Sequence, residues 1–314
     1  MPPKLIVVCG PTATGKTRLG VALAKRLDGE VVSADSMQLY RGMPIGTAQP
    51  TEAEREGVPH HMMGIADPAE PYSVARYVEE ASVCVDDILR RGKRPILVGG
   101  TGQYIDALCS GRTFSASRPE SGKRAQLQAV ADAGGLPQLW ADLQRVDPAA
   151  AAALHPNDAK RIVRALEVWY ETGKPISRHN AETRTVPPRY DRATIVLNYA
   201  DRAVLRARID RRVDLMVAAG LIDEVRALLA AGVPADATAL QAIGYKQLIP
   251  AVRDGGDLAA AIEEVKLRSR QYAKRQLTWF RRCEGAHWID MEENAKFSDV
   301  VQDSTAFLTA DGVG

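Results

Sequence analysis

The stretch Gly10-Pro-Thr-Ala-Thr-Gly15-Lys16-Thr17 follows an apolar run, Leu5 to Cys9, and precedes a segment with helical spacing of its apolar residues. A buried strand, a glycine-rich loop and a helix in this order are the context that a phosphate-binding P-loop requires. The glycines let consecutive backbone N–H groups turn toward an anion, and the helix adds the positive end of its dipole. The alternative is a glycine turn that has only a structural role and binds no ligand. We predict that the phosphate ligands are Gly10, Pro11, Thr12, Ala13, Thr14, Gly15, Lys16 and Thr17, with the Thr17 hydroxyl on Mg²⁺.

Length and composition narrow the classes of protein. A chain of 314 residues can bury one sizeable core and a second, smaller unit. Its net charge is only +2, so any surface that binds nucleic acid has to be local. The four cysteines form no CxxC pair, which disfavours zinc and disulfides and favours reduced thiols in the cytoplasm. No apolar run approaches a membrane span and no signal peptide is recognisable, so we expect no membrane partner.

Further apolar runs predict more parallel strands, and an acidic residue follows one of them. Asp35 comes directly after the predicted strand Glu30–Ala34. Ligands of open parallel sheets bind beyond the carboxyl ends of the strands, so Asp35 is expected to face whatever the glycine loop holds. The alternative is an N-cap aspartate at a strand-to-helix turn. The other predicted strands are Pro95–Val98, Ala193–Asn198 and His287–Ile289.

The third strand ends in Gly99-Gly100-Thr101-Gly102. P-loop NTPases commonly carry a magnesium-binding aspartate at such a position, and here glycines and a threonine replace it. An Asn-Lys-x-Asp guanine-recognition motif is also absent. We therefore expect Thr101 to offer a hydrogen bond to a closely approaching ligand. A tight turn that needs positive φ is the alternative.

Residues 41–72 are rich in glycine and proline and predict a long ordered loop. His60 and His61 lie within it. Metal sites need more ligands than two adjacent histidines, so we favour a surface or capping role for this pair.

The sequence pattern changes between residues 115 and 189, where alanine-rich segments with helical spacing replace the apolar runs that predict strands. We predict a helical insert here, set into an α/β core made of residues 1–114 and 190–314. Ala159 to Tyr170 is an amphipathic helix with basic residues outside its apolar stripe. These basic residues suit RNA phosphates, and a solvated helix face is an equally good interpretation.

After the fourth strand, Arg208 and Arg212 are four residues apart and share a helix face. Such arginines can close over phosphates, whereas surface ion pairs with Asp210 or Asp214 are the alternative. The later segment Ala259–Phe280 interleaves cations with Tyr272, Trp279 and Phe280, which suits either an RNA loop or a core-facing stripe. The chain is expected to fray from Asp303 onward.

Together these stretches resemble the tRNA dimethylallyltransferases, also called isopentenyl-diphosphate:tRNA transferases, of the bacterial type. The P-loop alone fits many proteins, but its combination with the Asp35 and Thr101 stretches is specific. The stretches that carry the resemblance run in order along nearly the whole chain: Gly10–Thr17, Ala34-Asp-Ser-Met-Gln-Leu-Tyr40, Gly46-Thr-Ala48, Pro59-His60-His61, Gly99-Gly-Thr101, His155-Pro-Asn-Asp158 with Arg161 to Glu167, Ala242-Ile-Gly-Tyr-Lys-Gln247, Tyr272-Ala-Lys-Arg-Gln276 and Thr278-Trp279-Phe280-Arg281.

The resemblance implies a P-loop NTPase-like parallel sheet and a monomer that transfers a dimethylallyl group from dimethylallyl diphosphate to adenine N6, 3′ of the anticodon of tRNA. It implies that the P-loop holds the donor diphosphate, with Mg²⁺ as cofactor, and that Asp35 is the general base. Lys16, Arg208 and Thr101 join Asp35 as catalytic residues, and Arg212 joins the diphosphate site. The residues it implies for contact with the tRNA anticodon stem-loop are Asp35, Ser36, Met37, Gln38, Thr101, Lys123, Ala159, Lys160, Arg161, Ile162 and Val163.

Two other functions fit parts of the sequence. A small-molecule or nucleoside kinase shares the P-loop, the closing arginines and an inserted acceptor domain, and it would consume ATP. An RNA-binding NTPase switch would need nucleotide-sensing residues, and none of the guanine-specific kind is found. The missing acidic residue after the third strand and the Asp35 stretch argue against the kinase.

Overall fold

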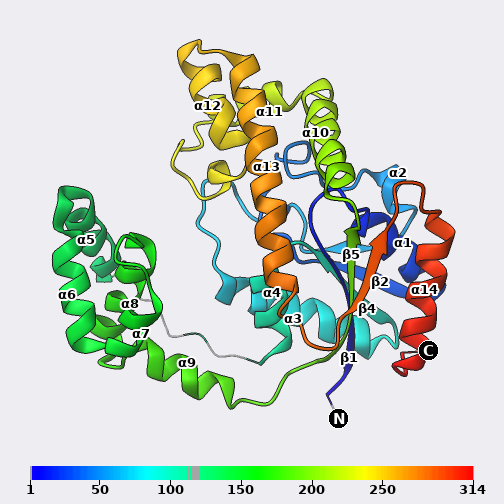
Figure 1. Cartoon of the computed structure of the whole chain (residues 1–314), viewed down its shortest axis with the longest axis horizontal. Helices are drawn as coiled ribbons and strands as arrows, with labels where there is room; N and C mark the ends of the chain where they lie inside the picture. The colour runs from blue at the N-terminus through cyan, green and yellow to red at the C-terminus, as the bar shows by residue number, and fades with distance from the viewer. Residues whose placement is uncertain (1, 112–113, 115–120, 314) are drawn as a thin grey trace. The chain divides into compact units, whose positions relative to one another are not determined.

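The computed structural model describes residues 2–111, 114 and 121–313. Its centre is a sheet of parallel strands in the order β3-β2-β4-β1-β5-β6, which confirms the predicted P-loop-like α/β fold (Figure 1). The short strand β3 was missed, because His60 and His61 lie within the segment predicted as a loop. The strand bounds are Lys4–Cys9 (β1), Gly29–Ser33 (β2), His60–His61 (β3), Arg94–Gly99 (β4), Asp191–Tyr199 (β5) and His287–Met291 (β6).

The central strand β1 has a core on each of its two faces. Leu5 and Val7 belong to one apolar cluster, and Ile6 and Val8 belong to another. Parallel strands covered on both faces read as continuous apolar runs, which is why this strand was recognisable in the sequence. Helices α3 (Val74–Arg90) and α4 (Gly102–Cys109) contribute to the first cluster, and α1 (Lys16–Arg26) and α14 (Phe297–Ala310) contribute to the second.

Helix α14 corrects the expectation that the chain frays from Asp303. Val300, Ser304 and Leu308 are buried, and the helix packs against α1. These residues recur every four positions, so they line one face of the helix. The spacing was present in the sequence and was overlooked among the polar residues between them.

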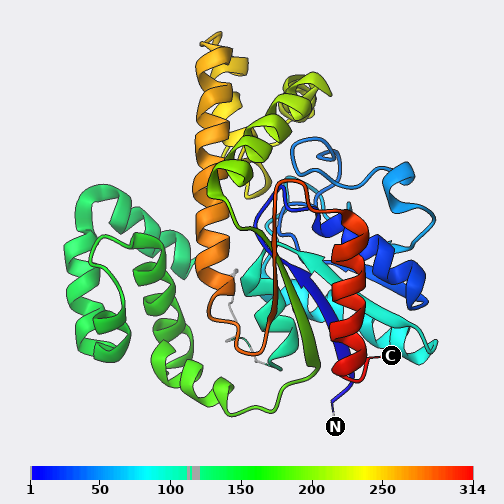
Figure 2. The ribbon, with the colours of Figure 1, turned by 45° about the vertical axis from the view of Figure 1, so that its right-hand side comes forward.

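Helices that follow β5 stand together beyond that strand, and α13 lies beside α10 in both views (Figures 1 and 2). Within the described residues, no helix combines the length and the apolar character needed to cross a bilayer. The bounds of this group are Arg202–Ala218 (α10), Leu221–Ala230 (α11), Tyr245–Asp254 (α12) and Leu258–Phe280 (α13).

The chain divides into two compact units, Met1–Cys109 with Arg189–Gly314, and Ser110–Pro188. The second unit is helical and has its own core, which includes Leu143, Ile162 and Leu166. Its helices are Lys123–Val130 (α5), Leu136–Val146 (α6), Pro148–Ala153 (α7), Ala159–Thr172 (α8) and Ile176–Arg184 (α9). The remaining short helix, Glu52–Arg55 (α2), belongs to the first unit.

Two glycines let the backbone segments at the carboxyl edge of the sheet approach one another. A Cβ atom on Gly99 would lie 2.2 Å from the Ala34 carbonyl oxygen, and one on Gly10 would lie 2.2 Å from the Leu197 oxygen. Real Cβ atoms do not come this close to backbone, so a larger residue at either position would push the loops apart. The loop after β4 therefore lies directly against the end of β2.

We predict that Gly99→Ala lowers the free energy of unfolding by about 1 to 3 kcal/mol or more, the usual cost of overpacking against atoms that cannot move aside. Urea denaturation measures the effect. Gly256→Ala is the control, because Gly256 is exposed and its Cβ would meet the nearest atom, the Cα of Ala251, at 3.3 Å instead of 2.2 Å. Equal stability of the two variants would contradict the close approach at Gly99.

Candidate functional site

The glycine loop after β1 has the geometry of an anion site. Gly15 has φ 90° and precedes helix α1 without any side-chain cap, so the first amides of that helix keep their hydrogen-bonding capacity. Within the described residues the Thr17 hydroxyl has no hydrogen-bond partner. A hydroxyl beside a phosphate site fits Mg²⁺, which prefers oxygen ligands and usually keeps phosphates and water as the others.

Lys16 lies at the centre of this site. Its Nζ donates a hydrogen bond to the Pro11 carbonyl oxygen at 2.6 Å. Burial and, to a smaller extent, the positive charge of Arg212 lower the pKa of Lys16 to about 8, although the carboxylate of Asp35 opposes both. Lys16, Asp35 and Arg212 therefore interact electrostatically, although they come from three different elements. The structure therefore brings Lys16 and Arg212, which were predicted to bind the diphosphate, close to Asp35, the predicted base.

The two arginines of α10 point to the same site. Arg208 donates from Nε to the Ala13 carbonyl oxygen at 3.1 Å, and its guanidinium lies 4.9 Å from the centre of the Tyr199 ring. Burial lowers the pKa of Arg212, and Asp35 partly offsets the effect. The alternative of surface ion pairs for these arginines is wrong. The structure pairs Asp210 with Arg270 at 2.5 Å and Asp214 with Lys266 at 2.7 Å.

Asp35 lies in a tight turn that Thr101 holds in place. Asp35 Oδ1 accepts a hydrogen bond from the Met37 backbone N–H at 2.9 Å, so the carboxylate caps its own turn with one oxygen. Thr101 Oγ1 accepts from the Ser36 N–H at 3.1 Å, and the Thr101 N–H donates to the Ala34 oxygen at 3.1 Å. Asp35, Ser36, Met37 and Thr101 all remain partly exposed. The second oxygen of Asp35 accepts no hydrogen bond from the described residues, which leaves it for a ligand.

Gln38, a predicted tRNA contact, is used inside the protein. Its side chain is buried and accepts a hydrogen bond from Ser33 Oγ at 2.9 Å. Its Nε2 donates to the Ala48 oxygen at 3.0 Å. In this conformation Gln38 fixes the loop that follows the Asp35 turn, and contact with RNA would require these bonds to be exchanged.

A buried carboxylate that the sequence did not reveal also holds this loop. Glu224 of α11 accepts hydrogen bonds from the Ile45 and Gly46 N–H groups at 2.8 and 2.9 Å. The Tyr245 hydroxyl donates to the same carboxylate at 2.5 Å, and a Cβ on Gly46 would lie 2.5 Å from the Tyr245 ring. These partners are far apart in the chain, so residue spacing carries no signal for them.

The predicted tRNA contacts of the insert differ in exposure. Lys160 is exposed, and Arg161 is exposed and paired with Asp158 at 2.7 Å. The side chains of Ile162 and Val163 lie in the insert's own core, which leaves only their backbone for a ligand. The remaining two residues of the prediction are Ala159, the first residue of α8, and Lys123, whose Nζ donates to Gln126 at 3.1 Å.

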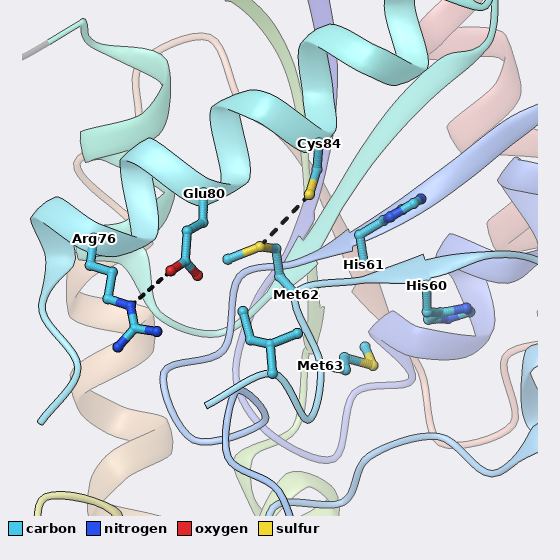
Figure 3. A pocket seen from close by; sticks show the side chains of 8 residues that line it. His60, His61, Met62, Met63, Arg76, Glu80 and Cys84 are labelled. Carbon is cyan, nitrogen blue, oxygen red and sulfur yellow. Dashed lines mark hydrogen bonds and ion pairs between the residues drawn. The ribbon is translucent and has the colours of Figure 1, made fainter. Parts of the chain in front are cut away.

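His60 and His61 line a separate open hollow of about 470 Å³, together with Arg76, Glu80 and Cys84 of α3 (Figure 3). His61 hydrogen-bonds with buried Glu30 at 2.8 Å. Hydrogen bonds from Arg91 hold the pKa of Glu30 down at about 2. Among the described residues, no group of three or more histidine, cysteine or acidic side chains could hold a metal. The two histidines form β3, the strand at one edge of the sheet.

Fold and site together define a P-loop α/β protein in which the loop after β1 lies close to a carboxylate that follows β2, two strands away in the sheet. Comparison with known proteins narrows this class. Residues 38–283 match the family model described as IPP transferase, and residues 3–63 match the one described as isopentenyl transferase. The chain belongs to the tRNA dimethylallyltransferase (IPP transferase) family.

Individual relatives are similar in sequence to this protein over nearly its whole chain. The tRNA dimethylallyltransferase of Geobacillus thermodenitrificans is 46% identical, over 98% of this chain and 97% of that protein. The crystal structure of a tRNA isopentenylpyrophosphate transferase from Bacillus halodurans is 43% identical, with a TM-score of 0.73, and covers 98% of this chain and 96% of its own. A eukaryotic dimethylallyltransferase acting on tRNA is 32% identical with a TM-score of 0.84, over 99% of this chain and 79% of that one.

The pKa of Lys16 predicts how affinity for diphosphate depends on pH. The lysine must be charged to bind the anion, so above about pH 8 its charged fraction falls tenfold per pH unit, and Kd rises by up to that factor. Calorimetric titration with inorganic diphosphate between about pH 7 and 9.5 measures this. Lys16→Arg keeps its charge throughout and corrects for the titration of diphosphate itself. Identical pH profiles of the two proteins would contradict the lowered pKa.

Proposed function

We propose that this protein transfers the dimethylallyl group of dimethylallyl diphosphate to N6 of the adenosine on the 3′ side of the anticodon in tRNA. The observation that carries the proposal is the shared site of Lys16, Arg212 and Asp35. The two cations can stabilise the charge of a leaving diphosphate, and the nearby carboxylate can accept a proton from an attacking amine. The names of the relatives point to the same reaction.

On the donor side, the bond between the allylic carbon and the diphosphate oxygen breaks, and the diphosphate leaves with the electron pair. Negative charge grows on that oxygen as the bond lengthens. The amides at the start of α1, Lys16, Arg208 and Arg212 are placed to stabilise this charge. Lys16 must release the Pro11 oxygen to do so. Mg²⁺ bound through Thr17 would supply further positive charge to the diphosphate.

On the acceptor side, adenine N6 forms the new bond to carbon and loses one proton. Asp35 is the base, and its unpartnered oxygen accepts that proton as N6 attacks. Thr101 holds the Asp35 turn and lies where it can hydrogen-bond the extruded nucleotide. Extruding a base costs a few kcal/mol and is easiest in a loop that is already single-stranded, which favours an anticodon loop over duplex RNA.

All residues assigned to the reaction come from one chain, so we propose that a monomer is sufficient. We further propose that Lys123, Lys160 and Arg161 bind the tRNA backbone. The kinase alternative is not favoured, because the family and its relatives are transferases that modify tRNA. Whether the protein consumes ATP is measured in the labelling experiment below.

We predict that Asp35→Ala slows transfer by two or more orders of magnitude, the usual contribution of a general base. The Kd of an anticodon stem-loop should change only a few-fold. Single-turnover incorporation of labelled dimethylallyl groups measures the rate, and Glu79→Ala, an exposed carboxylate on α3, is the control. A variant that retained the full rate would remove Asp35 from the mechanism.

One incubation separates the three candidate functions. The protein is mixed with labelled dimethylallyl diphosphate, ATP and bulk tRNA. Label in tRNA supports transfer, and phosphate released from ATP without label in tRNA supports a nucleotide switch. If neither signal appears, the kinase alternative stands and is tested with a screen of small-molecule acceptors.

The insert provides a second test. Lys160→Ala should weaken tRNA binding and lower its salt dependence by about one phosphate contact, with no change in diphosphate affinity. Ile162→Ala should instead destabilise the insert by about 2 to 5 kcal/mol, because its side chain is buried in the core. Filter binding at several salt concentrations and thermal melting distinguish the two. An unchanged salt slope in Lys160→Ala would argue against contact with RNA.

A further inference from the structure

Helix α13 inserts one glutamine between the glycine loop and the loop after β4. Gln276 Oε1 accepts a hydrogen bond from the Thr12 backbone N–H at 2.9 Å. Gln276 Nε2 donates to the Gly100 carbonyl oxygen at 3.0 Å. The side chain is only 5% exposed. A single amide therefore ties together the ends of two neighbouring strands, β1 and β4.

The fit around Gln276 is close on the side of the β4 loop. A Cβ on Gly100 would lie 2.1 Å from Gln276 Nε2, and a Cβ on Gly102 would lie 2.2 Å from the Trp279 ring. Only residues without a side chain let α13 come this near. The glycines after β4, interpreted from the sequence as room for a ligand or a turn, make room for this helix.

The connection continues to the acceptor carboxylate. Thr101 follows Gly100 and holds the Asp35 turn through the Ser36 N–H and the Ala34 oxygen. Tyr272, one helical turn before Gln276, also lies close to Thr101 and Gln276. A continuous path thus runs from Thr12 in the phosphate loop through Gln276 to the turn that carries Asp35.

We propose that Gln276 is a positioning residue that sets the distance between the diphosphate loop and the Asp35 turn. The inference rests on the proposed function and deepens it. Gln276 takes up the Thr12 N–H, so this amide is not free for phosphate and the anion meets the later amides of the loop. Gln276 therefore acts through the loops and not on a substrate.

The consequence is a specific kinetic signature. Each loop keeps its own ligand site when the bridge is lost, because Lys16, the α1 amides and Asp35 are held by other contacts. What changes is the separation of the two reactants. A misplacement of about 1 Å can cost on the order of 100-fold in rate, since reaction needs a near-attack geometry.

The test is Gln276→Met, which keeps the length of the side chain and removes both hydrogen bonds. We expect kcat for transfer to an anticodon stem-loop to fall by about 10- to 100-fold. The Kd values of inorganic diphosphate and of the stem-loop, each measured alone, should stay within about threefold. Ser304→Ala is the control, because it also loses a buried hydrogen bond, to the Val300 oxygen at 2.7 Å, on the distant helix α14. It should keep the wild-type kcat.

Gln276→Asn is the second variant. It keeps the amide but is one methylene shorter, so it can reach only one of the two loops at a time. It folds more readily than a variant with no polar partner, and its kcat should also fall. Wild-type kcat in either Gln276 variant overturns the proposal, and so does a loss of diphosphate affinity as large as the loss of kcat. If the wild-type protein puts no label into tRNA, the proposed function fails before Gln276 is tested.

Discussion

The close approach of backbone segments at the carboxyl edge of the sheet is the constraint on which the site depends. Gly10 lies against Leu197, and Gly99 lies against Ala34, at distances that leave no space for a Cβ atom. Parallel pairing brings the ends of β1, β2, β4 and β5 to one edge, and the glycines then remove the last few ångströms between them. The phosphate loop and the Asp35 turn become neighbours in this way.

Electrostatics follows from this arrangement. Lys16 and Arg212 share a partly buried site. Burial lowers the pKa of both, the charge of Arg212 also lowers the pKa of Lys16, and the carboxylate of Asp35 opposes these effects. A site with surplus positive charge in poor solvent contact favours an anion. The same charges would attract an anion much more weakly in bulk water. Burying the two cations therefore costs free energy, and the binding of a diphosphate can offset that cost.

Helices from the second half of the chain keep the loops in place. Gln276 joins the phosphate loop to the loop after β4, and Glu224 holds the segment at Ile45 and Gly46. Both are buried polar side chains that bond to backbone groups of loops, and Glu224 also accepts a hydrogen bond from the Tyr245 hydroxyl. A buried polar group without its hydrogen bond costs free energy, so these bonds strongly favour one loop conformation. The first half of the chain supplies the glycine loop, Lys16 and Asp35, and the second half supplies Arg208, Arg212 and much of the geometry.

The sequence by itself determined the parallel sheet, the phosphate loop and the identity of Asp35 and Thr101 as candidate residues. These are local signals, because a fully buried strand and a glycine loop are each written in fewer than about ten consecutive residues. The sequence did not show β3, whose two residues are too few for a period, whereas the four-residue spacing of α14 was present and was overlooked. Only the tertiary structure decided that Gln38 bonds within its own loop and that Gln276 and Glu224 reach loops far away in the chain. Contacts of this kind depend on which surfaces meet after folding, and neither residue type nor spacing encodes that in one sequence.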